Sequence, residues 1–108
     1  MTQLPAPLAE LPGGSGGDGG VAAAEGRLRA AGVEPMAWGN GPGDRYAAHE
    51  HGYTKLLICA EGSITFFIGP DATAVELTPG TGFEMPPRTL HAAVVGPDGC
   101  TCVEGHRP

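Results

Sequence analysis

From residue 36 onward, short apolar runs alternate with turns rich in glycine and proline, and this pattern constrains the fold more than any other feature. Runs this short suit strands better than helices. Short strands at regular spacing, bounded by Gly and Pro, are typical of an antiparallel sandwich or barrel. The sequence therefore predicts an all-β domain over residues 36–108. The expected strands are 36–38, 45–49, 54–60, 63–68, 73–78, 82–85, 90–95 and 100–104.

Two of these runs, 56–59 and 64–68, are continuously apolar. An alternating pattern marks a strand with one face in contact with water, whereas a continuous apolar run is expected where both faces are covered.

Residues 21–31 suit one short helix, which carries Val21, Ala24 and Leu28 on one face and stops at Gly32. That face is narrow, so we expect the helix and its connection (21–35) to rest on the domain.

The first 20 residues have the composition of a flexible arm. They hold nine of the chain's 30 glycine and proline residues and few apolar side chains. A segment of this kind has little surface to bury. We expect residues 1–20 to be disordered, and deletion of residues 1–18 to change thermal stability little.

Charge and composition exclude several classes of partner. Six basic and twelve acidic residues give a formal charge of −6, and Lys55 is the only lysine. Without a cluster of basic residues the chain has no electrostatic footprint for nucleic acid. It lacks both the apolar run of about 20 residues that spans a bilayer and the basic, apolar start of a signal peptide. We therefore expect a cytoplasmic protein with no membrane partner.

Three cysteines, an odd number, do not indicate a disulfide framework. Cys100 and Cys102 share one face of an expected strand, with His106 four residues beyond Cys102. As a metal site this set is one ligand short. Free core thiols explain these cysteines, and Cys59 in its apolar run, better.

His49 and His51 are two residues apart in a strand-like segment, so both side chains leave the same face. Their Cα atoms are then about 6.5–7 Å apart, and two imidazoles at that spacing can converge on one ion with bonds of about 2.1 Å. A bare His-x-His is a weak signal, since two surface histidines give the same pattern.

The residues around this pair form a longer pattern. Gly43, His49, His51, Lys55 and Gly62 follow the spacing G-x5-H-x-H-x3-K-x6-G, and a second group follows G-x5-P-x-R-x2-H at Gly80, Pro86, Arg88 and His91. Together they resemble the two motifs of the cupin superfamily over about residues 36–105. Three positions depart from it: Lys55 replaces a glutamate, Arg88 a glycine and Val95 an asparagine.

The resemblance implies a cupin-type jelly-roll β-barrel in which His49, His51 and His91 bind a divalent transition metal. Three histidines suit Fe, Ni, Zn, Mn or Cu, and ligand type alone does not choose among them. Vestigial polar residues in a cupin pocket are the alternative. Small cupins resemble one another in pairing through sheet edges, and a free edge needs cover, so a homodimer is expected.

Lys55 is the most informative departure, because an ammonium repels a divalent cation where a glutamate would bind it. Three arrangements are open: Lys55 turns to solvent, points inward to hold an anionic group of a substrate, or has replaced the metal. Lys55 and Tyr53 are the evident acid/base candidates beside the histidines, and Arg45 also flanks the site. Glu84 and Glu104 are candidate hydrogen-bond partners for an imidazole, or else ordinary surface carboxylates.

Two main functions fit these residues. The first is a small metalloenzyme of oxygenase, isomerase or decarboxylase type, acting on a small organic molecule that bears a carboxylate if Lys55 points inward. The alternative is a non-catalytic module that binds a small ligand or the metal itself. A purely structural dimerisation domain fits the apolar strands but leaves the histidines unexplained.

Overall fold

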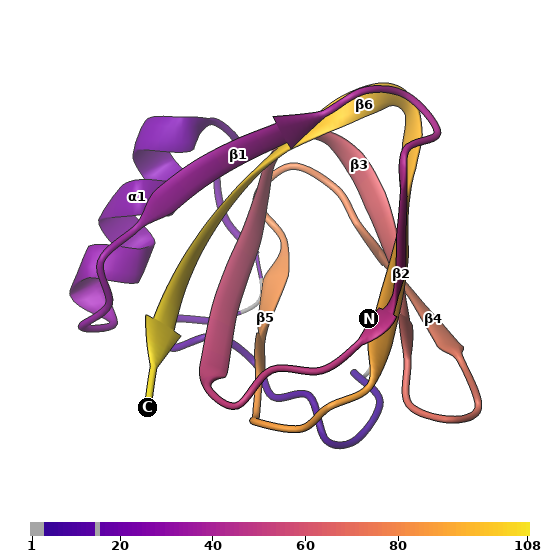
Figure 1. Ribbon diagram of the computed structural model, residues 1–108. Coiled ribbons are helices and arrows are strands. Elements are labelled where there is room, and N and C mark those ends of the chain that lie inside the picture. Colours follow the sequence, from indigo (N-terminus) through magenta and orange to yellow (C-terminus); the bar gives the residue numbers. More distant parts are fainter. Residues whose placement is uncertain (1–3, 15) are drawn as a thin grey trace.

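The computed structural model describes residues 4–14 and 16–108 and confirms an all-β jelly roll with one helix (Figure 1). Four expected strands are present almost as predicted. The other four are merged in pairs, because 54–60 joins 63–68 and 90–95 joins 100–104. The elements are α1 (Val21–Ala30), β1 (Met36–Asn40), β2 (Arg45–His49), β3 (Thr54–Ile68), β4 (Thr73–Leu77), β5 (Gly82–Met85) and β6 (His91–Arg107).

The two long strands, β3 and β6, bend where Gly62 of β3 lies against Gly99 of β6. Gly62 and Gly99 both have left-handed backbone angles, with φ of 71° and 78°. A Cβ atom on Gly62 would overlap the carbonyl group of Gly99, so no other residue fits there. The β3–β6 register also shifts on both sides of this point. Gly62 therefore shapes a bend inside one strand, where the sequence had suggested a turn between two.

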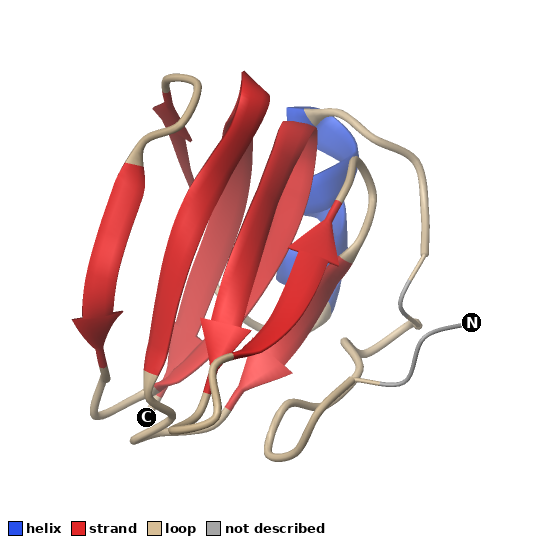
Figure 2. Ribbon diagram, turned by 90° about the vertical axis from the view of Figure 1, so that its right-hand side faces the viewer, coloured by secondary structure: helices blue, strands red, loops and turns tan. Residues whose placement is uncertain are grey.

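This bend carries β3 and β6 from one sheet of the barrel into the other. Before its bend β3 pairs with β5 and with the second half of β6, which pairs in turn with β1. Beyond the bend β3 pairs with β4 and with the first half of β6, which also pairs with β2. All pairings are antiparallel, and Figure 2 shows the strands facing one another across the interior.

Helix α1 packs on the outside of the barrel, over β3 and β6 (Figure 1). Its buried residues, Ala24 and Leu28, join a cluster that contains Leu56 and Ile58. The alternate residues of the same strand, such as Leu57, face the barrel interior. This explains the continuous apolar run in β3, because the helix covers one face and the barrel core the other.

The N-terminal arm corrects the expectation of disorder over residues 4–14 and 16–20; residues 1–3 and 15 lie outside the described residues. Leu8 and Leu11 are 8% and 4% exposed, and each belongs to a core cluster. Ala9 exchanges two backbone hydrogen bonds with Glu84, of 2.9 and 2.8 Å, so the arm covers the open edge of β5. Arg27 donates to the carbonyl oxygens of Gly14 and Gly80. The arm is therefore packed against the barrel through two leucines and the edge of β5, although its average composition had predicted a segment with little to bury.

Over the part of the chain that is described, no helix has the length and apolar character needed to cross a membrane.

Candidate metal centre

The fold brings His49, His51 and His91 to one end of the barrel. His49 ends β2 and is the Cα partner of His91, the first residue of β6. His51 follows in the loop to β3, and its carbonyl oxygen accepts a 2.7 Å hydrogen bond from the N–H of Arg88. Arg88 has a φ of 64°, a conformation that favours the glycine it replaces in the motif. One ring nitrogen from each histidine lies within 4.8 Å of the other two.

Two of the rings are oriented by backbone carbonyl groups. Nδ1 of His49 lies 2.7 Å from the carbonyl oxygen of Ala47, and Nδ1 of His91 lies 2.8 Å from that of Thr89. A carbonyl oxygen only accepts, so each Nδ1 carries the proton and each Nε2 keeps a free lone pair. A donated Nδ1–H is the usual arrangement of a metal-binding histidine.

The Nε2 atoms of His51 and His91 are buried without a hydrogen-bond partner among the described residues. Buried polar atoms normally have partners, and an ion would supply one. Two nitrogens on one ion with bonds of about 2.1 Å lie about 3–4 Å apart, so binding would draw the rings slightly together. These residues therefore fit a divalent metal ion.

The surroundings of His51 and His91 disfavour the charged form of both rings. Burial, and then the charge of Lys55, lower the pKa of His51 to about 4. Burial also lowers the pKa of His91, against the opposing effect of its hydrogen bond to Thr89. A neutral imidazole is the form that binds a metal.

We expect the metal-free protein to lose stability as the pH falls from about 6.5, the usual pKa of histidine, towards 4. Over this range the unfolded chain binds protons at His51 that the folded chain does not, so stability rises with pH. In the presence of a chelator, the melting temperature of His51→Gln should fall less steeply than that of the wild type as the pH is lowered. Equal slopes in the variant and the wild type would contradict the lowered pKa.

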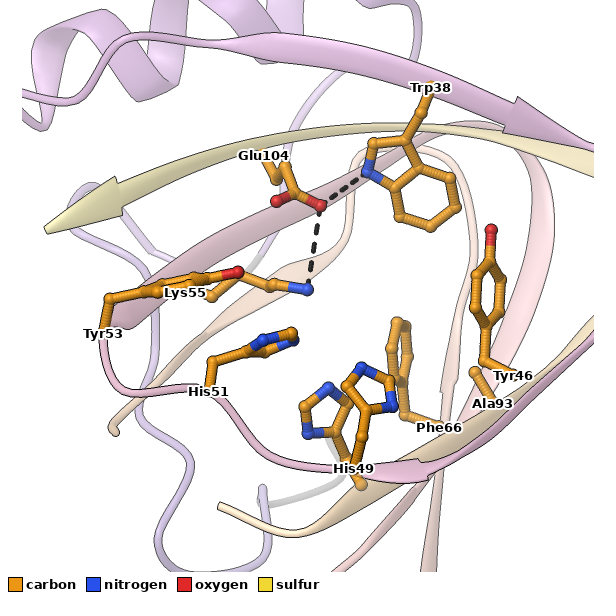
Figure 3. Close-up of a pocket in the computed structure, with 10 residues that line it drawn as sticks. Trp38, Tyr46, His49, His51, Tyr53, Lys55, Phe66, Ala93 and Glu104 are labelled. Carbon is orange, nitrogen blue, oxygen red and sulfur yellow. Dashed lines mark hydrogen bonds and ion pairs between the residues drawn. The ribbon is translucent and has the colours of Figure 1, made fainter. Parts of the chain in front are cut away.

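The histidines open onto a cavity of about 270 Å³ (Figure 3). One side of the cavity carries the imidazoles, and aromatic side chains and a buried ion pair form much of the remainder. A volume at the low end of ligand pockets suits a small molecule. The lining residues are Trp38, Tyr46, His49, His51, Tyr53, Lys55, Phe66, His91, Ala93 and Glu104.

Lys55 points into this cavity, so the arrangement in which it turns to solvent is wrong. The residue is 8% exposed, and its Nζ lies 3.7 Å from Oε1 of Glu104. That separation exceeds a hydrogen bond, which leaves ammonium N–H groups free to face the cavity (Figure 3). The alternation in β3 could have predicted this orientation, because Leu57 and Cys59 on the same face are interior.

Glu104 is a polar residue of the pocket whose role the sequence left open between a hydrogen-bond partner of an imidazole and an ordinary surface carboxylate. Its Oε1 accepts a 2.6 Å hydrogen bond from Nε1 of Trp38, and its Oε2 is paired with the ring of His106. Burial raises the pKa of Glu104, but Lys55, His106 and Trp38 outweigh it and lower the pKa overall. Glu104 is therefore a fixed, charged partner of Lys55. Its place between Cys102 and His106 on one strand face was the available signal.

The remaining candidates divide between the pocket and the surface. Tyr53 lines the cavity. Arg45 is exposed on β2, outside the lining residues, and Glu84 pairs with Arg107 at 2.6 Å, so it is no partner of the imidazoles. His106 pairs with Glu104. The three cysteines are free and buried, as expected for core thiols.

Comparison with known proteins agrees with this fold. The family model of the AraC-like ligand binding domain matches residues 34–103. No curated protein sequence matches significantly.

Solved structures give the same fold with low identity. An RmlC-like cupin from Shewanella frigidimarina is 24% identical, with a TM-score of 0.61 over 70% of this chain and 66% of its own. A structure of the DMSP lyases RdDddP and RnDddQII is 27% identical, with a TM-score of 0.58 over 68% and 36%. QdtA, a sugar 3,4-ketoisomerase from Thermoanaerobacterium thermosaccharolyticum in complex with TDP, is 15% identical, with a TM-score of 0.59 over 69% and 58%. The chain thus spans less than two thirds of the length of each of these proteins.

Proposed function

Since this chain belongs to the AraC-like ligand binding domain family of the cupin superfamily, we propose that its pocket holds a divalent transition metal and a small organic anion. His49, His51 and His91 are the proposed metal ligands. The observation that carries the proposal is the pair of buried Nε2 atoms, on His51 and His91, that lack a partner among the described residues. Fe, Ni, Zn, Mn and Cu all suit three neutral imidazoles.

The charges of the pocket favour an anionic ligand. Lys55 and Glu104 offset one another, and burial lowers the pKa of His51 and His91, so the charge of a divalent ion would remain uncompensated. A carboxylate at an open position of the ion would reduce that charge. Lys55 can donate to the same ligand, because Nζ has no hydrogen bond to Glu104 at 3.7 Å. The cavity of about 270 Å³ limits the ligand to a compact molecule.

The first form of this function is a metalloenzyme acting on such a carboxylate. A bound ion supplies Lewis-acid chemistry, or redox chemistry if it is iron, manganese or copper. Lys55 then holds a proton next to the ligand and is the candidate acid, with the Tyr53 hydroxyl as a second candidate. Glu104 keeps the ammonium group in place.

The second form is a ligand-binding module without catalysis, which the family match favours because the model describes a ligand binding domain. Among the structural neighbours, one comes from a study of DMSP lyases and another is a sugar 3,4-ketoisomerase, so the shared fold does not choose between the two forms. A homodimer also stays a prediction. It is supported by β1, whose only partner among the described strands is β6.

Lys55→Met tests the anion-binding part of the proposal. In zinc-loaded protein we expect malonate to bind at least about 10-fold more weakly to this variant, the loss typical of one charge-assisted hydrogen bond. Zinc affinity should be retained or increased, since a like charge is removed. Isothermal titration measures both, and Arg45→Met is the matched control because it removes an exposed charge outside the pocket. Malonate binding unchanged by Lys55→Met would refute the role of the lysine.

Two further measurements address the metal and the chemistry. Elemental analysis of protein purified without an affinity tag or chelator should find a stoichiometric transition metal. Proton NMR of a bound carboxylate over several hours then separates the two forms. New resonances that depend on His91 indicate an enzyme, and an unchanged spectrum indicates a binding module.

A further inference from the structure

His51 differs from the other two histidines in what holds its ring. Nδ1 of His49 and Nδ1 of His91 each meet a backbone carbonyl oxygen. Among the described residues no such hydrogen bond holds His51, and its Nε2 is buried without a partner. His51 also lies in the loop between β2 and β3, outside any strand. Its ring plane therefore needs another support if it is to meet an ion shared with His49 and His91.

That support is a stack of aromatic rings. The ring of Tyr53 lies 4.8 Å from that of His51, centroid to centroid, at an interplanar angle of 20°. Tyr53 also stacks on His106, at 4.0 Å and 27°. The neighbouring rings of His49 and His91 meet His51 at steeper angles of 79° and 47°. Tyr53 is thus the ring that lies flat on His51.

The stack is anchored to the barrel through His106. The ring of His106 is paired with the carboxylate of Glu104, which Trp38 and Lys55 hold in turn. His106 lies on β6, opposite Lys55 in the register of β3. A rigid strand therefore fixes one end of the stack, and the loop histidine lies at its other end.

We propose that Tyr53 is a positioning residue that orients His51 for metal binding through this stack, with His106 and Glu104 as its anchor. The proposal rests on the proposed metal site and assigns Tyr53 a role that needs its ring and not its hydroxyl group. Groups that orient metal ligands typically change metal affinity by about 10–100-fold when they are removed.

The test compares Tyr53→Leu with Tyr53→Phe. We expect Tyr53→Leu to weaken zinc binding at least about 10-fold, measured by competition with a chromophoric chelator, and to alter the visible spectrum of bound Co²⁺. Tyr53→Phe keeps the ring and should match the wild type in both measurements. His106→Leu keeps Tyr53 on His51 but removes the far end of the stack and its anchor on Glu104, so it should cause a smaller loss. It also provides a test if Tyr53→Leu does not fold.

Three outcomes would overturn the proposal. One is wild-type zinc affinity in both Tyr53→Leu and His106→Leu. A second is an equal loss in Tyr53→Phe and Tyr53→Leu, which would assign the effect to the hydroxyl group. The third is a wild-type protein that binds neither Zn²⁺ nor Co²⁺, which would also remove the proposed metal site. The first two leave that site intact, so the two failures are distinguishable.

Discussion

Replacing Leu8 and Leu11 together by alanine should lower the melting temperature by at least about 15 °C. A buried leucine truncated to alanine costs about 2–5 kcal/mol, and both residues are buried. Each kcal/mol corresponds to about 4–8 °C in a domain of this size. The two sites belong to different core clusters, so their losses should largely add.

Glu10→Ala and Pro12→Ala are the matched controls, because both residues lie beside these leucines in the arm and are exposed. Each should change the melting temperature by no more than a few degrees, measured by circular dichroism. Removal of residues 1–14 should be at least as harmful as the double substitution, since it also uncovers the edge of β5. If the truncated protein is as stable as the full chain, the arm does not contribute to the core, and the prediction of a flexible arm from composition is correct.

The positions of the strands could be predicted from sequence because a buried strand appears in the sequence as a run of apolar residues. Residues 56–59 alternate between the helix-side and interior clusters, and that is visible as a run without polar residues. The bend in β3 was not predictable in the same way. Gly62 indicates a turn when the sequence is considered alone. In the structure a glycine is required there because the carbonyl group of Gly99, 37 positions along the chain, leaves no room for a Cβ atom. Only the tertiary structure brings the two together.

The arm shows the opposite limitation. Composition averages a segment, whereas packing depends on individual side chains. Leu8 and Leu11 are few among prolines and glycines, yet each fills a place in a core that helix α1 and β5 leave open. Nothing local to residues 4–14 indicates those places, because they are formed by residues far along the chain.

In the pocket, the spacing of residues along the sequence was enough to identify the three histidines. The ion pair of Lys55 and Glu104 depends on how strands β3 and β6 pair. The H-x-H spacing predicted that His49 and His51 lie together, although His51 lies in the loop beyond β2, and the second motif supplied His91. The sequence left the orientation of Lys55 open among three arrangements, although alternation with Leu57 and Cys59 was enough to predict an inward side chain. The role of Glu104 required the β3–β6 register, which places its carboxylate beside Lys55. A buried ion pair of this kind is not encoded within either strand alone.

His91→Ala should abolish the stabilisation of the protein by divalent metal. An ion that binds only the folded state stabilises it by about 2.7 kcal/mol at 100 times its dissociation constant, which corresponds to a rise of roughly 10–20 °C. His91 is the most buried of the three histidines, at 2% exposure, and Thr89 fixes its ring. Without it two imidazoles remain, one of them on the loop. Removal of a group that only orients a ligand costs up to about 100-fold in affinity, so loss of the ligand itself should cost at least about 100-fold.

The substitution also leaves a cavity in the core, so the useful quantity is the difference in melting temperature between metal-loaded and chelated samples of each variant. Val95→Ala is the matched control, because Val95 lies on the same strand, is 2% exposed and faces the interior away from the cavity. It should lose stability in both samples but keep the full rise with metal. If His91→Ala retains half of the wild-type rise, His91 is not a ligand. The ion, if one binds, would then belong to His49 and His51 with solvent, and the buried Nε2 of His91 would need a different partner.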